Sequence, residues 1–363
     1  MRVIDYHVNQ VVVNNKTIEV SEFFKTLQKL VIKAKKKQPR TDFDINLSQI
    51  EIRLTFFSNK LTDTLLPALS HLTHSSTFQN FQYQIFILDS ASIDSPFPSI
   101  ENISNKFIFR GDIEGFSTYQ YQIAYLVHSK LICALDHIKK IGIVIAQDSK
   151  LIPKFTTASP LKEIFNWIML RNQCSLIHAA AVGNQDGAVL LVGKSGSGKS
   201  ITAIRCLFHG LDFYGDDIVG ISNKKGPLIH SIFSTAKTFH KDIKEISGLE
   251  KCSILSNLKP YDKEIFFFNE HFKKQLPIQA RLTGILHIIQ SDDKASITLT
   301  SAANILSIVG STSITMFPYS NQTHILQLMS LFKSVPCFKF ELGNQVNKIA
   351  SKLKQFLKLM AKN

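Results

Sequence analysis

The stretch that decides the fold is Gly193-Lys194-Ser195-Gly196-Ser197-Gly198-Lys199-Ser200. It fits the pattern Gly-x-x-x-x-Gly-Lys-Ser of the phosphate-binding P-loop. The apolar run at 187–192 before it is typical of a buried strand, and residues 200–209 after it predict an amphipathic helix closed by Gly210. A chance glycine-rich turn is the alternative, but it would not require these flanks. We therefore expect a strand, a phosphate-binding loop and a helix, in that order.

The chemistry of phosphate binding explains each part of this loop. Glycines let successive backbone N–H groups turn inward around phosphate oxygens, and the helix N-terminus adds its dipole and free N–H groups. We expect Lys199 to reach the β- and γ-phosphates of ATP and the Ser200 hydroxyl to ligate Mg²⁺. The sequence thus predicts ATP and Mg²⁺ as cofactors, bound by the whole stretch from Gly193 to Ser200.

A pair of adjacent carboxylates follows at a useful distance. Residues 212–214 predict a second strand that ends in Gly215-Asp216-Asp217 and continues through 218–221. One helix and one strand separate this pair from Lys199, so it can return to the phosphate end of the sheet. One carboxylate can then serve Mg²⁺ while the other accepts a proton from an attacking hydroxyl. A solvated turn is the alternative interpretation.

Asp292 and Asp293 compete for the metal-binding role, because they too end an apolar run, at 284–289. The alternating segment 296–299 follows them directly, which predicts a β-hairpin with Asp292-Asp293-Lys294 in its turn. We therefore prefer Asp216 and Asp217.

Composition limits the class of protein. With 363 residues, 44% hydrophobic and 19% charged, the chain can form a folded core and is long enough for two domains. It shows neither an apolar stretch of 18 residues nor the apolar core of a signal peptide at its start. Five scattered cysteines without a Cys-x-x-Cys pair favour reduced thiols and a cytoplasmic location over a zinc site or disulfides.

The formal net charge of +14 comes partly from two lysine-rich segments, near 29–40 and 348–362. In the second segment apolar residues repeat at helical spacing between the lysines. We interpret both as solvated helix faces, and no motif here predicts nucleic-acid binding.

The first half reads as a separate α+β region. We expect a helix from Glu22 to about Lys37, capped by Ser21, and then mainly strands at 50–57, 83–88, 106–109 and 141–146. Pro160 is expected to open a helix over 161–171. The domain boundary therefore falls between Gln147 and Pro160, which gives an N-terminal domain over 1–150 and a second domain over 155–363.

Several motifs together resemble the catalytic domain of HPr kinase/phosphorylase, and the HPr-kinase-like proteins found with lasso-peptide genes still more closely. The matching segments are 176–182, the P-loop, 214–217, 230–237, 268–272 and 335–343. The resemblance spans about residues 155–360. It implies an α/β (α+β) P-loop kinase core related to phosphoenolpyruvate carboxykinases, with ATP- and Mg²⁺-dependent phosphorylation of a serine hydroxyl.

The resemblance also implies roles for single residues. Lys199 and Ser200 would bind phosphate and metal, Asp216 would serve the metal, and Asp217 would be the general base. His178 falls where the bifunctional enzymes have an active-site histidine, although a core histidine bonded to backbone explains it equally well. Lys237 and Arg281 are candidates for neutralising phosphate charge, or else surface residues.

The chain departs from the family in one segment. It lacks the Gly- and Ile-rich stretch linked to phosphorolysis, so the resemblance leaves phosphorylase activity and HPr as substrate undecided. The N-terminal 150 residues match no family and are expected to hold the specificity.

We therefore expect a kinase that acts on a serine or similar hydroxyl of a protein, peptide or small molecule. A nucleotide-sensing module without phosphotransfer and a carboxykinase-like enzyme are the alternatives, and a homo-oligomer is left open.

Overall fold

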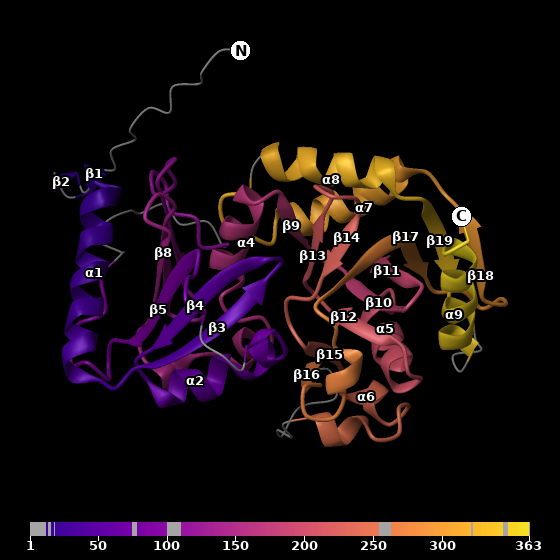
Figure 1. Cartoon of the computed structure of the whole chain (residues 1–363), viewed down its shortest axis with the longest axis horizontal. Helices are drawn as coiled ribbons and strands as arrows, with labels where there is room; N and C mark the ends of the chain where they lie inside the picture. Colours follow the sequence, from indigo (N-terminus) through magenta and orange to yellow (C-terminus); the bar gives the residue numbers. More distant parts are fainter. Residues whose placement is uncertain are drawn as a thin grey trace, which may run out of the picture. The chain divides into compact units, whose positions relative to one another are not determined.

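The computed structural model describes residues 12–13, 16–17, 19–74, 78–99, 110–253, 263–320, 322–343 and 348–362. They form a mixed α/β architecture, as the sequence predicts (Figure 1). The chain divides into two compact units. Unit 1 comprises Met1–Leu66, Thr73–Ile168 and Phe317–Tyr319, and unit 2 comprises Pro67–Leu72, Met169–Met316 and Ser320–Asn363. The expected strand at 106–109 lies outside the described residues.

Unit 1 is built on a six-stranded mixed sheet in the order β3-β4-β5-β8-β7-β6. Its strands are β3 (Thr41–Leu47), β4 (Ile50–Phe56), β5 (Tyr83–Asp89), β6 (Tyr121–Leu126), β7 (Leu131–Asp136) and β8 (Ile141–Ala146). The short strands β1 (Val12–Val13) and β2 (Lys16–Thr17) pair with each other. The remaining elements are α1 (Val20–Lys37), α2 (Asn59–Leu65), η2 (Ser149–Leu151) and α3 (Lys154–Ala158).

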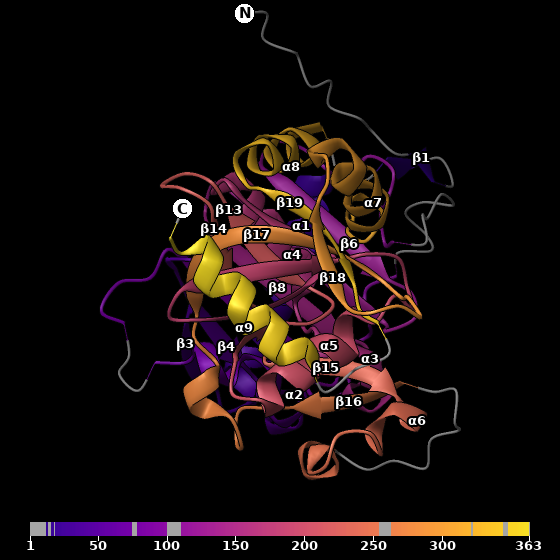
Figure 2. The same ribbon diagram turned by 90° about the vertical axis from the view of Figure 1, so that its right-hand side faces the viewer.

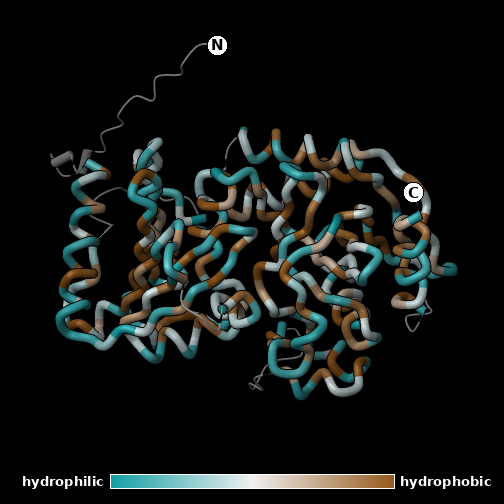
Figure 3. Tube along the Cα trace, in the orientation of Figure 1, coloured by the Kyte–Doolittle hydropathy of each residue, from teal (hydrophilic) through white to brown (hydrophobic). Residues whose placement is uncertain are grey.

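Helix α1 covers one face of this sheet through its apolar stripe. Phe23, Leu27, Val31 and Ala34 are buried on this stripe. Figure 3 shows hydrophobic and hydrophilic positions alternating along α1. The helix begins two residues earlier than expected, after Glu19, so Ser21 lies inside the first turn and is not its cap.

Unit 2 is built on a nine-stranded mixed sheet in the order β12-β10-β11-β17-β14-β13-β9, with β19 also paired to β17 and β18 paired to β19. Its strands are β9 (Cys174–Ile177), β10 (Ala180–Asn184), β11 (Gly187–Val192), β12 (Asp212–Gly215), β13 (Val219–Ser222), β14 (Leu228–His230), β17 (Gln279–Ile289), β18 (Ser296–Leu299) and β19 (Cys337–Glu341). A separate two-stranded sheet pairs β15 (Thr235–Phe239) with β16 (Lys263–Phe267).

Helices cover both faces of the large sheet. Helices α5 (Lys199–Phe208) and α9 (Ile349–Met360) pack on one face. In Figure 2, α9 is the yellow helix that crosses the strands of the sheet. Helices α7 (Ala302–Ile314) and α8 (Gln322–Ser334) pack on the other. The remaining elements are α4 (Lys162–Arg171), α6 (His240–Ile243), η1 (Pro67–Leu72), η3 (Leu249–Cys252) and η4 (Lys273–Gln275). The sequence boundary between Ile168 of unit 1 and Met169 of unit 2 falls within α4.

The strand direction at the centre of this sheet decides where a site can lie. Strands β11, β17 and β19 are parallel, and Val192 pairs with His287, which pairs with Lys339. Their carboxyl ends therefore share one edge of the sheet, and the glycine loop, residues 193–198, leaves β11 at this edge. In open α/β sheets ligands bind outside such carboxyl ends.

Three expectations about strands and helices are wrong in detail. Residues 218–221 do not continue the strand at 212–214, because Asp216 and Asp217 form a turn and β13 joins the sheet elsewhere, between β14 and β9. Residues 284–289 and 296–299 do not form a hairpin, because β19 lies between β17 and β18 and pairs with both. Helix α4 begins at Lys162, since Leu161 has a φ of +60° that a helix does not contain.

All five cysteines are buried and free. Among the described residues, none of the helices has the length and apolarity needed to cross a membrane.

Candidate functional site

The glycine loop joins a buried strand to a helix N-terminus, as the sequence predicts. Every residue of β11 is buried, and α5 begins at Lys199 with Gly198 as its N-cap. Gly198 has a φ of +99°, and a Cβ there would lie 2.8 Å from Gln290 Nε2 and 2.9 Å from Leu342 Cδ1. Gly193 is equally constrained, because its Cβ would lie 2.7 Å from Ser197 Oγ. The loop therefore needs glycine at both ends to keep its shape.

Lys199 lies across this loop. Its ammonium donates hydrogen bonds to the backbone oxygens of Gly193 at 2.8 Å and Lys194 at 3.1 Å. The residue is 6% exposed, and burial lowers the pKa of its ammonium although Asp216 and Asp217 act in the opposite direction. A positive charge is thus fixed at the mouth of the loop, beside the free N–H groups of the α5 N-terminus.

Asp216 is the buried member of the carboxylate pair. Its Oδ2 accepts the Lys237 backbone N–H at 3.1 Å, whereas its buried Oδ1 has no hydrogen-bond partner among the described residues. Burial and then the charge of Asp217 raise the pKa of this carboxyl, and the Lys237 N–H and the Ser200 side chain partly oppose them. A buried acceptor oxygen without a donor is costly unless a ligand satisfies it.

Asp217 lies in a strained turn between two basic side chains. Its φ is +68°, and the Ile218 N–H donates to the Asp216 oxygen at 2.8 Å, which closes a three-residue turn around Asp217. Its Oδ2 lies 2.7 Å from Lys237 Nζ, and its Oδ1 lies 3.1 Å from His178 Nδ1. Burial alone would raise the pKa of this carboxyl, but Lys237 and His178 together hold it well below its usual range. Backbone strain of this kind is found at functional sites.

His178 is positioned from both sides. It lies between β9 and β10, and its backbone N–H donates to Ser313 Oγ of α7 at 2.9 Å. Its Nδ1 also lies 3.0 Å from the backbone oxygen of Asp217. Because two oxygens face Nδ1, the hydrogen of a neutral imidazole belongs on that nitrogen, which leaves Nε2 with the lone pair. His178 therefore binds backbone and also contacts the Asp217 carboxylate, a geometry compatible with both interpretations of the sequence.

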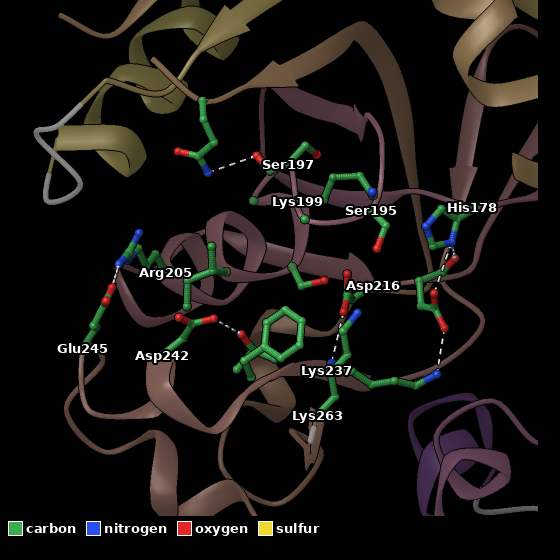
Figure 4. Close-up of a pocket in the computed structure, with 18 residues that line it drawn as sticks. His178, Ser195, Ser197, Lys199, Arg205, Asp216, Lys237, Asp242, Glu245 and Lys263 are labelled. Atoms are coloured by element: carbon green, nitrogen blue, oxygen red, sulfur yellow. Dashed lines mark hydrogen bonds and ion pairs between the residues drawn. The ribbon is translucent and has the colours of Figure 1, made fainter. Parts of the chain in front are cut away.

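These groups share one cavity of about 360 Å³ (Figure 4). Ten of the thirteen site residues predicted from the sequence line it: His178, Ser195, Gly196, Ser197, Gly198, Lys199, Ser200, Asp216, Asp217 and Lys237. Gly193 and Lys194 belong to the loop but do not line the cavity. Asp292 and Asp293, the competing pair, do not line it either.

Arg281 is not brought to this cavity. It pairs with Leu228 near the start of β17, next to Leu282, which pairs with Ala188 near the start of β11. The glycine loop leaves the opposite end of β11. The Arg281 side chain is exposed and lies 3.5 Å from the Asp186 backbone oxygen. Its place in the sheet therefore gives no support to a phosphate-binding role.

Sequence reasoning missed eight residues that line the cavity: Ile201, Arg205, Thr238, Phe239, Asp242, Glu245, Lys263 and Gln290. Gln290 follows β17 and donates from Nε2 to the Ser197 backbone oxygen at 3.2 Å, and its place directly after the apolar run was the available signal. Arg205 is one turn beyond Ile201 on α5 and forms an ion pair with Glu245. Thr238 Oγ1 donates to Asp242 Oδ2 at 3.0 Å.

The residues at the loop suit a hard cation that shares its ligands with phosphate. No group of three or more His, Cys, Asp or Glu side chains among the described residues is arranged to hold a metal alone. The Ser200 hydroxyl and the unpartnered Asp216 oxygen are oxygen donors of the kind that Mg²⁺ prefers, and Mg²⁺ usually completes its shell with water and phosphate oxygens.

Comparison with known proteins gives little beyond this geometry. No family model and no curated protein matches the chain. Among solved structures the chain is similar to the Hpr(Ser) kinase/phosphatase from Coxiella burnetii, with a TM-score of 0.31 and 10% sequence identity. That match covers 52% of this chain and 99% of the other. A similarity this low carries no argument about fold or activity.

Proposed function

We propose that this protein is an ATP- and Mg²⁺-dependent phosphotransferase with a P-loop kinase core, which transfers the γ-phosphate to a serine or similar hydroxyl of a protein, peptide or small molecule. One observation carries the proposal. A buried lysine on a glycine loop, a helix N-terminus and two unequal carboxylates face one cavity. Phosphoryl transfer depends mainly on positioning and on charge neutralisation, and these groups supply both.

The loop and Lys199 bind the phosphates in this proposal. Backbone N–H groups of residues 193–198 and the start of α5 face the α- and β-phosphates, and the Lys199 ammonium reaches the β- and γ-phosphates. Because Lys199 already lies in the cavity, held by two loop oxygens, its charge needs little rearrangement when the nucleotide binds.

Ser200 and Asp216 would hold Mg²⁺. The fit rests on the unpartnered Oδ1 of Asp216 and on the raised pKa of this carboxyl, since both reflect a buried acceptor that a cation would satisfy. When bound, Mg²⁺ neutralises charge that develops on the phosphate oxygens.

The environments of the two aspartates support different roles for them. Burial raises the pKa of Asp216, whereas Lys237 and His178 lower that of Asp217 against the effect of burial. A carboxylate held far below its ordinary pKa is a weak proton acceptor. Asp217 instead resembles the third group of a nucleophile–base–orienter arrangement, because it fixes Nδ1 of His178 and leaves Nε2 as the acceptor.

Phosphoryl transfer in this proposal exchanges one bond to the γ-phosphorus for another. The acceptor hydroxyl oxygen forms a bond to the γ-phosphorus while the bond to the β,γ-bridging oxygen breaks, and ADP leaves. The hydroxyl proton passes to Nε2 of His178, with Asp217 as the orienting carboxylate. The sequence alone predicts Asp217 itself as the base, and the transfer rates of Asp217→Asn and His178→Gln test both assignments.

A labelled-phosphate experiment tests this function. The protein is incubated with Mg²⁺ and γ-labelled ATP against a panel of hydroxyl-bearing proteins, peptides and small molecules, and mass spectrometry locates the transferred phosphate. Lys199→Ala should abolish transfer, since it removes charge stabilisation of several kcal/mol. Lys194→Ala is the matched control in the same loop, because Lys194 is exposed and does not line the cavity. Equal transfer by the wild type and Lys199→Ala would contradict the proposal.

A nucleotide-sensing module without phosphotransfer is the alternative function. Binding ATP alone needs no proton acceptor, so a His178–Asp217 pair at the γ-phosphate end favours the kinase. Tight binding of Mg-ATP with no labelled product from any acceptor would favour the sensor.

A further inference from the structure

The cavity has a second end that the phosphate chemistry does not use. His178 marks one end in Figure 4, and Arg205, Asp242 and Glu245 lie at the other. Asp217 belongs to the His178 end, because its carboxylate contacts both His178 and Lys237. Phe239, Thr238 and Lys263 complete the lining. No motif in the sequence accounts for these side chains, although they occupy a large part of the cavity.

The loop fixes the direction in which a triphosphate would lie. Asp216, Ser200 and Lys199 mark the β- and γ-phosphate region, and the carboxylate–histidine pair lies beside it. Ile201 follows Ser200 in the first turn of α5, and Arg205 lies one turn farther from the loop. The α-phosphate of such a triphosphate, and whatever is attached to it, would therefore point along α5, toward Arg205 and Glu245 and away from Asp217.

The chemistry of this second end suits an uncharged group with an aromatic face and hydroxyls. Phe239 and Ile201 are the apolar side chains, glycine apart, among the described residues that line the cavity. Lys263 Nζ lies 5.3 Å from the centroid of the Phe239 ring. Two carboxylates, Asp242 and Glu245, accompany the cations Arg205 and Lys263, so formal charges at this end balance and no further phosphate is attracted there.

Asp242 is well placed as a hydroxyl acceptor. Its Oδ2 already accepts the Thr238 hydroxyl at 3.0 Å, which orients the carboxylate on α6. A carboxylate can accept about four hydrogen bonds, so it retains capacity for the hydroxyls of a sugar.

We propose that this end is the nucleoside subsite, in which the base stacks on Phe239 and the ribose hydroxyls donate hydrogen bonds to the Asp242 carboxylate. The inference rests on the proposed function and adds an orientation to it. The nucleoside lies along α5, and the phosphate acceptor enters from the side of His178 and Lys237.

Affinities for two ligands that share the triphosphate isolate this subsite. Calorimetry measures the dissociation constants of Mg-ATP and of Mg-tripolyphosphate, which lacks a nucleoside, for the wild type and for Phe239→Leu. Stacking of a base on an aromatic ring is worth enough to predict about a 5- to 100-fold loss of ATP affinity. Tripolyphosphate affinity should change by less than about twofold, because its contacts lie on the loop. Phe239→Trp should retain ATP binding.

A control and two adverse outcomes complete the test. Phe155→Leu changes a phenylalanine that is 53% exposed on α3 and should alter neither affinity. Equal losses for ATP and tripolyphosphate in a folded Phe239→Leu variant would overturn the subsite, since the ring would then support the phosphate end. Unchanged affinity for both ligands would overturn it too, but would leave the proposed function standing. Failure of the wild type to bind either ligand would instead overturn the proposed function and this inference together.

Discussion

Replacing Gly198 by alanine tests whether the glycine loop has the conformation described. Gly198 caps α5 with a φ of +99°, and its added Cβ would lie within 3 Å of both Gln290 Nε2 and Leu342 Cδ1. Gly196 provides a matched control in the same loop. Its φ is +80°, but a Cβ there would meet nothing within 4 Å.

The expected loss of stability has two contributions, the backbone strain of an alanine at positive φ and the steric overlap of its Cβ with neighbouring atoms. A left-handed conformation costs an alanine about 1–2 kcal/mol, and the lower entropy of the unfolded chain returns about 0.4–1 kcal/mol. Gly196→Ala should therefore destabilise by about 0–1.5 kcal/mol. Gly198→Ala bears the same strain plus an overpacking cost of about 1–3 kcal/mol, reduced where the Gln290 amide can move.

Thermal unfolding of both variants without ligand, followed by tripolyphosphate titration, measures the difference. For a unit of this size each kcal/mol corresponds to about 2–4 °C in Tm, so Gly198→Ala should melt several degrees below Gly196→Ala. It should also bind tripolyphosphate more weakly, because Gln290 no longer holds the Ser197 oxygen. Equal Tm values for the two variants would refute the packing described around Gly198.

Three further predictions follow from the charged and buried groups. Asp216→Asn should lose the Mg²⁺-dependent part of the ATP affinity measured by calorimetry. It should cost little stability, because burial raises the pKa of Asp216 and the charged carboxylate already disfavours folding. An unchanged dependence of ATP affinity on Mg²⁺ would contradict the metal role. Asp217→Asn should lower the free energy of unfolding measured in urea at pH 7. This loss of stability relative to wild type should shrink below about pH 4, because the folded-state pKa of Asp217 is lowered and the stabilisation by its charge is lost as the pH falls. A loss that does not depend on pH would exclude the ion pair with Lys237. Burial lowers the pKa of His230 to about 4, so the wild type should lose about 2 kcal/mol of stability between pH 7 and pH 5. The variant His230→Gln can still bind Ser222 and should not show this loss. Parallel profiles of stability against pH for the two proteins would contradict the burial of a neutral imidazole.

Local patterns predicted the loop and its flanks well. The run 187–192 is a buried strand and α5 follows within one residue of the expected start, because glycine spacing, strand composition and helix periodicity all act over a few residues. Pairing between distant segments could not be predicted in this way. The hairpin expected at 284–299 fails since β19, some forty residues later, inserts between the two strands.

The residues of the candidate site likewise fall into those with a local sequence signal and those without one. Lys199, Asp216 and Asp217 carry motif signals, and the structure places all three at one cavity. Phe239 and Asp242 carry none, because they reach the cavity through the pairing of β15 with β16 and the short helix α6. Arg281 lies near the start of β17, away from the loop, and the sequence around it does not say which end of that strand faces the loop.

The most direct test of the central claim compares binding and transfer in variants of the His178–Asp217 pair. Asp217→Asn and His178→Gln are given Mg-ATP and the best acceptor from the panel, and nucleotide affinity is measured beside the rate of label transfer. The account predicts near wild-type affinity with transfer slowed by a factor of roughly 10² to 10⁴, which is the usual contribution of a positioned base. Wild-type transfer rates in both variants would contradict it, because the pair would then have no part in moving the proton.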